Sequence, residues 1–143
     1  MSASPIDLET LRGFFRSAPF MVDLGVEPLA VEPGRVRTEL VLQPRHRQHT
    51  GVVHAGVMIA LADHSMGAAA QTQAPAGRWV LTAELKSSLL RGADGERLVC
   101  EAWVLKAGRS LSFTEAEVHA EQGARRVLVL KASATMALTA AAD

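Results

Sequence analysis

The sequence predicts an α+β domain in which one antiparallel sheet packs against a single long helix. Residues 55–72 form an apolar stretch of helical length, and the segments around it alternate apolar and polar residues with the period of two that is typical of strands. Short turns rich in glycine and polar residues separate the last strand segments. A chain of 143 residues can build one core, so residues 1–143 are expected to form a single domain.

The N-terminal segment, residues 1–20, is expected to be helical. Ser4 is a suitable cap, Pro5 fits the first turn, and the pair Ala18-Pro19 should end the helix. Beyond it, alternation and turn residues predict two strands and a polar loop. These elements are a strand at 25–31, a turn at 32–34, a strand at 36–42 and a loop at 43–50.

The stretch 55–72 is expected to be the central helix, stopped by Ala74-Pro75-Ala76-Gly77. Because it is apolar on nearly every side, one sheet would not cover it, and a second subunit is expected to complete its burial. Four strands follow, which we expect to pair in chain order as a meander. In the first of them, Leu81 and Leu85 should share one face and Thr82 the other. The four strands are 79–89, 98–105, 110–120 and 127–138.

Composition excludes several classes of partner and location. Fifteen basic and fifteen acidic residues cancel, so charge favours neither a nucleic acid nor a membrane surface. The single cysteine, Cys100, rules out an internal disulfide, fits a reducing cytoplasm, and is interpreted as a small buried hydrophobe. The N-terminus lacks the basic start of a signal peptide, and Asp63 and several histidines interrupt the apolar run 52–70. We therefore expect a cytoplasmic protein with a core helix rather than a membrane span.

Asp63 is the only Asp, Glu, Lys or Arg between Arg47 and Arg78. A carboxylate among aliphatic neighbours is costly unless it is paired, so chains seldom keep one for stability, and a catalytic role is the first hypothesis. Gly67, one turn later, is interpreted as a sign of close packing between helix and sheet. Trp79 is interpreted as a packing residue.

The segment Gly51–Gly56 leads into the central helix, whose first backbone N–H groups have no partners within the helix. Together with the helix dipole they form a site for an anion or oxyanion. Ala55 and Asp63 are eight residues apart, however, which is roughly 12 Å along a helix axis. Two antiparallel copies of the helix across a two-fold axis would bring the Asp63 of one subunit to the Ala55 of the other. The spacing therefore predicts a dimer with shared sites.

The stretch from Gln48 to Asp63 resembles the signature of hotdog-fold acyl-CoA thioesterases. The closest group is the phenylacetate-degradation (PaaI-type) group, which is related to the 4-hydroxybenzoyl-CoA thioesterases, and the resemblance covers about residues 20–138. It implies a curved antiparallel sheet around the central helix, hydrolysis of an acyl-CoA without metal or cofactor, and dimers often paired into tetramers. The family pattern is Asn or Gln, two residues, Gly, two residues, His-Gly-Gly, and an acid some seven residues on. The matching residues are Gln48, Gly51, His54, Ala55, Gly56 and Asp63.

The resemblance also implies roles for individual residues. Asp63 matches the catalytic carboxylate, as nucleophile or general base, and Ala55 stands where the family has the glycine whose backbone N–H polarises the thioester carbonyl. Gln48 matches the residue that places water or holds the thioester, and Thr82 falls near a position that orients water. The remaining catalytic positions are His54, which shapes the helix start, and its neighbour Gly56. The expected CoA contacts are Arg91, Gly108, Arg109 and Ser110.

Other interpretations stay open. Asp63 is alternatively a structural group bonded to backbone or to His64. The chain is alternatively a non-catalytic acyl-CoA-binding module, for which Ala55 is the one hint, or a hotdog enoyl-CoA hydratase or dehydratase, which needs a different acid–base pair. The acyl group is open between small aromatic and medium-chain groups. No metal is expected, because no standard zinc spacing is found among His46, His49, His54, His64 and Asp63.

Overall fold

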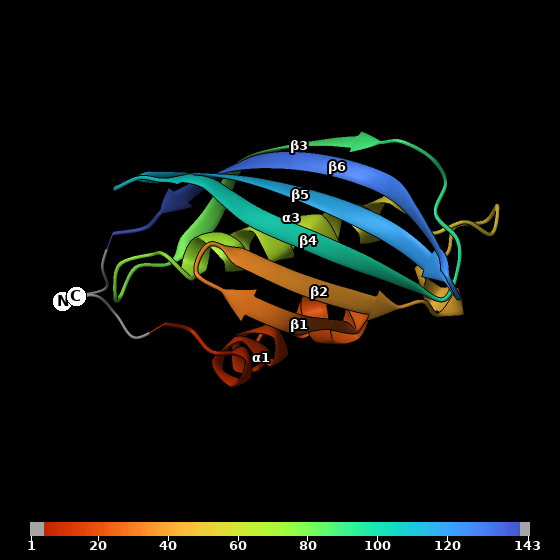
Figure 1. Ribbon diagram of the computed structural model, residues 1–143, viewed down its shortest axis with the longest axis horizontal. Helices are drawn as coiled ribbons and strands as arrows, with labels where there is room; N and C mark the ends of the chain where they lie inside the picture. The colour runs from red at the N-terminus through yellow and green to blue at the C-terminus, as the bar shows by residue number, and fades with distance from the viewer. Residues whose placement is uncertain (1–4, 141–143) are drawn as a thin grey trace.

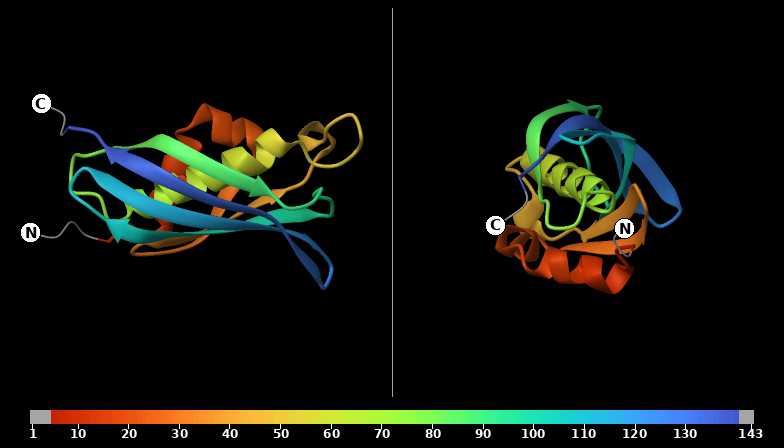
Figure 2. Two further views of the ribbon diagram at one scale, coloured as in Figure 1. Left: turned by 90° about the horizontal axis from the view of Figure 1, so that it is seen from above. Right: turned by 90° about the vertical axis from the view of Figure 1, so that its left-hand side faces the viewer.

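The computed structural model describes residues 5–140 as one curved, six-stranded antiparallel sheet wrapped around a central helix (Figures 1 and 2). This confirms the predicted α+β class and the hotdog architecture. None of the helices in the described range is long and apolar enough to cross a membrane. The elements are α1 (Leu8–Arg16), α2 (Pro19–Leu24), β1 (Val26–Glu32), β2 (Arg35–Val41), a 3-10 turn (Pro44–His46), α3 (Ala55–Gln71), β3 (Val80–Leu89), β4 (Arg97–Ala107), β5 (Leu111–Gln122) and β6 (Arg125–Leu138).

The order of strands in the sheet is β1-β2-β4-β5-β6-β3, so the expected four-strand meander is wrong. Of the four strands after α3, only β4, β5 and β6 pair in chain order, whereas β3 forms the far edge beside β6. The connection after β3 packs on the loop before α3, where the Val53 N–H donates to the Ala93 carbonyl at 2.9 Å. It then returns the chain to the middle of the sheet, where β4 pairs with β2.

Helix α3 uses one face for the core and leaves the other less covered. The core face includes Leu61 and Met66, both fully buried, and it packs mainly against β4 and β5. On the other face α1 covers only part of the helix, through Leu11 and Phe15, which are each 1% exposed. Figure 2 shows α1 lying outside the sheet beside this face. One sheet therefore does not enclose α3, as its apolar sequence predicted.

The N-terminal helix begins later than expected. Its cap is Asp7, whose carboxylate accepts from the Thr10 N–H at 2.8 Å, and hydrogen bonds from Thr10 lower the pKa of this carboxyl. The expected cap, Ser4, lies outside the described residues, and Pro5 precedes the helix. The helix ends before Pro19 as expected, but Pro19 then begins α2, because proline fits the first position of a helix.

A bulge in β3 reverses the predicted alternation of its side chains. Pairing with β6 shifts between Thr82 and Glu84, and an extra residue of this kind moves the following side chains to the opposite face. Thr82 and Leu85 both face α3 as a result, while Leu81 is 61% exposed. The prediction that Leu81 and Leu85 share a face is therefore wrong.

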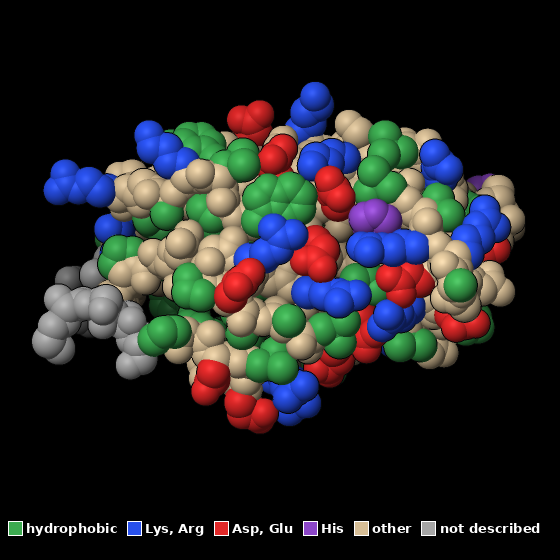
Figure 3. Space-filling model, viewed as in Figure 1, with side chains coloured by type: hydrophobic (Ala, Val, Ile, Leu, Met, Phe, Trp, Pro, Cys, Tyr) green, Lys and Arg blue, Asp and Glu red, His purple; other side chains and the backbone are tan. Residues whose placement is uncertain are grey.

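The outer face of the sheet carries interspersed acidic and basic side chains, many of which form ion pairs with one another (Figure 3). Arg97 contacts Glu39 at 2.6 Å and Glu121 at 2.8 Å, and Lys131 contacts Glu117 at 3.0 Å. Such exposed pairs contribute little to stability, but they keep this face polar. The less covered side of α3 is therefore better suited to a ligand site than the outer face of the sheet.

Cys100 lies in the core as predicted. It is fully buried, and burial raises the pKa of its thiol to about 12. Because the thiolate is the reactive form of cysteine, this residue is inert at neutral pH. Cys100 is therefore no candidate for a nucleophile.

Candidate active site

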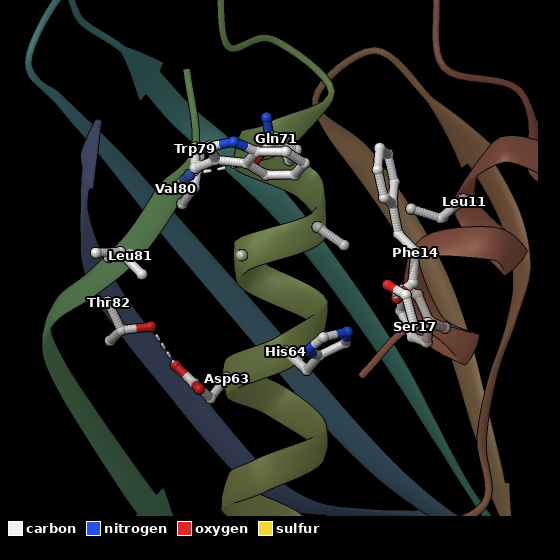
Figure 4. A pocket seen from close by; sticks show the side chains of 13 residues that line it. Leu11, Phe14, Ser17, Asp63, His64, Gln71, Trp79, Val80, Leu81 and Thr82 are labelled. Atoms are coloured by element: carbon white, nitrogen blue, oxygen red, sulfur yellow. Dashed lines mark hydrogen bonds between the residues drawn. The ribbon is translucent and has the colours of Figure 1, made fainter. Parts of the chain in front are cut away.

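Asp63 lies midway along α3, on the side that the sheet does not cover. Its Oδ1 accepts a hydrogen bond from the Thr82 Oγ1 on β3 at 2.6 Å (Figure 4). The same hydroxyl lies 3.5 Å from the Sδ of Met136. Asp63 is half-buried rather than sequestered, and it lines a cavity. The carboxylate is thus held by one neighbouring hydroxyl and still open to a ligand, which makes it less enclosed than the sequence predicted.

The start of α3 is capped by a histidine. The His54 Nδ1 accepts from the Gly56 N–H at 2.9 Å, so the Gly56 amide is already engaged. Among the described residues the Ala55 N–H finds no acceptor. Of these two amides, that of Ala55 is therefore the one available as a donor, and the catalytic role expected for Gly56 stays a prediction. His54 shapes the helix start, as the resemblance implied.

The loop before α3 is a tight turn held by backbone hydrogen bonds and by the side chain of Arg47. The Gln48 N–H donates to the Val52 carbonyl at 2.9 Å, and the Gly51 N–H donates back to the Gln48 carbonyl at 3.0 Å. Arg47 ties this turn to the next loop, because its Nη1 contacts both the Gly51 carbonyl at 2.8 Å and Asp94 at 2.6 Å. Gln48 therefore lies on a hydrogen-bonded turn before α3, whose first residue, Ala55, is roughly 12 Å along the helix axis from Asp63.

The four residues expected to contact CoA do not come together within one chain. Arg91 follows the end of β3, close to the start of α3, since Gly92 packs beside Val52. The hairpin that holds Gly108, Arg109 and Ser110 lies beside the start of β3, because the Leu138 N–H donates to the Ser110 carbonyl while Leu138 pairs with Val80. The length of β3 separates the two groups, roughly 30 Å at about 3.3 Å per residue.

Arg91 does have a basic neighbour that the sequence did not single out. Together with Arg125, from the turn between β5 and β6, it lines a cavity of about 150 Å³ that also includes Asp94. The two arginines are distant in sequence, and only the pairing of β5 with β6 and the path of the 90–96 connection bring them to one place. No local pattern in the sequence marks this cluster.

A larger cavity of about 310 Å³ runs along α3 from Asp63, between α1 and β3 (Figure 4). His64 lies beside Asp63 in its lining, with its ring packed edge-on against Phe15 at 4.5 Å between centroids. Burial lowers the pKa of His64, while the charge of Asp63 acts in the opposite direction. The far end is lined by Phe14 and Trp79.

Sequence reasoning singled out Asp63 and Thr82 but did not place Gly67 or Trp79 in this cavity. Trp79 packs against Phe14, but it is 56% exposed and lines the cavity rather than the core, which its interpretation as a packing residue did not foresee. Gly67 lines the cavity, and a Cβ added to it would meet no atom within 4 Å, so the interpretation as a close packing contact is wrong. An apolar residue gives the same pattern in a sequence whether it lines a core or a cavity, so periodicity held no signal for this difference.

Comparison with known proteins shows which family this chain resembles in sequence and in structure. Residues 50–127 match the profile of a family described as the thioesterase superfamily, whereas no curated protein matches the chain. A thioesterase family protein from Silicibacter pomeroyi superposes with a TM-score of 0.87 at 30% identity, over 90% of this chain and 94% of that one. A conserved protein from Pseudomonas aeruginosa gives 0.78 at 30% identity, over 85% and 94%. Zebra fish thioesterase superfamily member 2 gives 0.82 at 25% identity, over 94% and 99%.

Proposed function

Because the chain belongs to the thioesterase superfamily, we propose that it is an acyl-CoA thioesterase. It hydrolyses a small aromatic or medium-chain acyl-CoA to the carboxylic acid and free CoA. The observation that carries this proposal is the Asp63 carboxylate, fixed by Thr82 at 2.6 Å and open to an apolar cavity of about 310 Å³. Cavities that bind small ligands have about this size and are mostly apolar with a few placed polar groups.

The chemistry needs an acid–base or nucleophilic group and a donor for the developing oxyanion. Asp63 takes the proton of an attacking water, or attacks the carbonyl carbon itself to form an anhydride that water then cleaves. In both routes the carbon–sulfur bond breaks and the CoA thiolate leaves and is protonated. The Ala55 N–H, reinforced by the positive end of the α3 dipole, stabilises the charge on the carbonyl oxygen. Thr82 holds the carboxylate in position.

The reacting groups must meet within about 3–3.5 Å, and one chain holds Ala55 and Asp63 roughly 12 Å apart. We therefore propose that the site is shared between two subunits, with the Asp63 of one subunit facing the Ala55 of the other. The edge strand β3 supports this arrangement. Two β3 strands paired antiparallel across a two-fold axis would also bring Arg91 of one subunit near the 108–110 hairpin of its partner, where both groups can contact CoA.

The test is release of free CoA thiol by wild type and by Asp63→Asn. The Asn amide oxygen can still accept from Thr82, so the fold should persist while the reactive carboxylate is gone. We expect kcat to fall by about 10²–10⁴-fold, the range for losing an acid–base group. The matched control is Asp23→Asn, which changes an exposed carboxylate on α2 and should leave turnover unchanged.

Three results would contradict the proposal. The first is turnover by Asp63→Asn at the wild-type rate. The second is loss of enoyl-CoA absorbance without thiol release, which would indicate a hydratase. The third is saturable acyl-CoA binding by wild type without any turnover, which would indicate a binding module.

A further inference from the structure

The cavity beside Asp63 is a trough with defined walls. Its floor is one face of α3, one side wall is β3, and the other is α1 (Figure 4). From Asp63 to Gln71 it follows α3 for eight residues, which is roughly 12 Å. The wall formed by α1 is firmly anchored, because Leu11 and Phe15 point into the core and are each 1% exposed.

The floor of the trough is open because its residues are small. Gly67 and Ala68 follow Asp63 and His64 along the same face of α3. A side chain at Gly67 would project into free space, since an added Cβ has no neighbour within 4 Å. Glycine inside a helix costs about 1 kcal/mol relative to alanine, so its place here is unfavourable for the helix itself. An occupant that needs the space offers a physical reason for it.

The far end of the trough is closed by two aromatic rings. Phe14 of α1 and Trp79, just before β3, meet edge to face with their centroids 6.0 Å apart. Gln71 lies beneath them, and its amide is already bonded, donating to the Arg78 carbonyl at 2.9 Å and accepting from the Val80 N–H at 3.1 Å. The end of the trough is thus aromatic, and its polar side chain is engaged.

We propose that this trough holds the acyl group of the substrate and that Phe14 and Trp79 form the end wall that limits its length. This inference rests on the proposed function, because the thioester carbonyl must lie at Asp63 for the acyl group to extend along the floor over Gly67. The class of acyl group that fits is apolar and of medium length, either a straight chain or an aryl group on a short linker. A charged terminus would be desolvated against the two rings without a partner.

Two substitutions test the end wall and the floor, and they should shift the preference for acyl chain length in opposite directions. Trp79→Ala removes one ring, so the ratio of kcat/KM for dodecanoyl-CoA to that for octanoyl-CoA should rise about tenfold, the scale on which pocket contacts discriminate chain length. Gly67→Leu fills the floor, so the ratio of octanoyl-CoA to acetyl-CoA should fall about tenfold or more. Phe14→Ala should act like Trp79→Ala.

The matched control is Trp103→Ala. Trp103 lies on the outer face of the sheet, where Arg35 and Lys131 approach its ring at 5.3 and 4.7 Å, so both ratios should stay at their wild-type values. Unchanged ratios in Trp79→Ala and Gly67→Leu, with wild type active, would overturn the inference and leave the proposed function intact. A change of oligomeric state in Gly67→Leu, measured by light scattering, would also overturn it, since the trough would then hold protein.

A binding measurement separates the failure of the inference from the failure of the proposed function. In a Trp103→Phe background Trp79 is the one remaining tryptophan of the chain, which has two. We expect octanoyl-CoA to change its fluorescence and acetyl-CoA to leave it unchanged. This result would support the acyl trough even if wild type releases no thiol from any acyl-CoA. Equal responses to the two thioesters, or no response, would overturn it.

Discussion

Ala55 contributes a backbone N–H rather than a side chain, so most substitutions do not test it. Proline lacks this N–H and is tolerated as the first residue of a helix. The preceding His54 has φ −62° and ψ 135°, the extended conformation that a residue before proline prefers. We expect Ala55→Pro to lower kcat for acyl-CoA hydrolysis by about 10²–10³-fold, the effect of removing one oxyanion donor, with little change in Tm. Thiol release and thermal unfolding measure the two quantities.

The control for this variant is Ala55→Gly, which keeps the N–H and removes only the methyl group. Its turnover should stay close to wild type. Equal losses in the two variants would point to the shape of the helix start rather than to the amide. Full activity in Ala55→Pro would show that the oxyanion donor lies elsewhere.

At the scale of single residues, the sequence identified charged side chains better than glycines. Asp63 stood out because no other charge lies near it in the chain, whereas its hydrogen bond with Thr82 at 2.6 Å was not predicted and emerges only from the structure. Gly67 was misinterpreted as a close packing contact, and the cap that engages the Gly56 N–H was not predicted. An added Cβ at Gly56 would lie 3.1 Å from the His54 ring, whereas at Gly67 it would meet nothing within 4 Å. A missing side chain can serve a cap, a contact or a cavity, and only the surroundings tell these apart.

The short turn before α3 depends on a neutral histidine. The Nδ1 of His46 accepts from the Gln43 N–H at 2.9 Å, which leaves its Nε2 to donate to the Leu24 carbonyl at 2.7 Å. These bonds join the turn to the end of α2. His46 is 1% exposed, and a protonated ring would lose the acceptor at Nδ1. This element therefore needs the uncharged form of the ring.

The pH dependence of stability should report this requirement. Burial lowers the pKa of His46 below its ordinary value of 6.5, so the unfolded chain binds the proton more readily than the folded one. The contribution of neutral His46 is then complete above about pH 6.5 and is lost progressively as pH falls below it. We expect the urea midpoint of wild type to drop more between about pH 8 and about pH 5 than that of His46→Gln.

The matched control for this experiment is His49→Gln, in the exposed part of the same loop. It should follow the wild-type curve, including the contributions of His64 and His119, whose pKa values are also lowered by burial. Parallel curves for wild type and His46→Gln would contradict the role assigned to His46.

At the scale of elements, periodicity located the strands but not their partners. The predicted strand 36–42 is observed at Arg35–Val41, and the predicted helix 55–72 at Ala55–Gln71. Alternation is a local property, however, whereas the place of β3 beside β6 depends on a connection to β4 that passes two strands, β5 and β6. The bulge after Thr82 could not be predicted either, because nothing in the order of apolar and polar residues marks an extra, unpaired residue in a strand.

At the scale of the whole molecule, residues 5–140 of one chain leave the edge strand β3 without a partner on its outer side and one face of α3 only partly covered. β3 is a strand of 10 residues that, within the described chain, pairs on one side only, and Leu81 on it is 61% exposed. Long free edges of this kind are normally covered. The face of α3 that carries Asp63 is also only partly covered. The proposed second copy, related by a two-fold axis beside β3, would cover both features at once and would bring Asp63 toward the partner's helix start.

Complementation between two inactive variants tests this arrangement directly. Consider a hybrid dimer of one Asp63→Asn subunit and one Ala55→Pro subunit. If each site is shared between the subunits, one site would hold both defects. The other site would combine an intact Asp63 with an intact Ala55 N–H. A hybrid purified through a different affinity tag on each subunit should therefore recover about half of the wild-type turnover, since one of its two symmetric sites is whole. If each site belonged to a single chain, every site in the hybrid would carry one defect. The hybrid would then be no more active than its two parents, and the shared site would be ruled out.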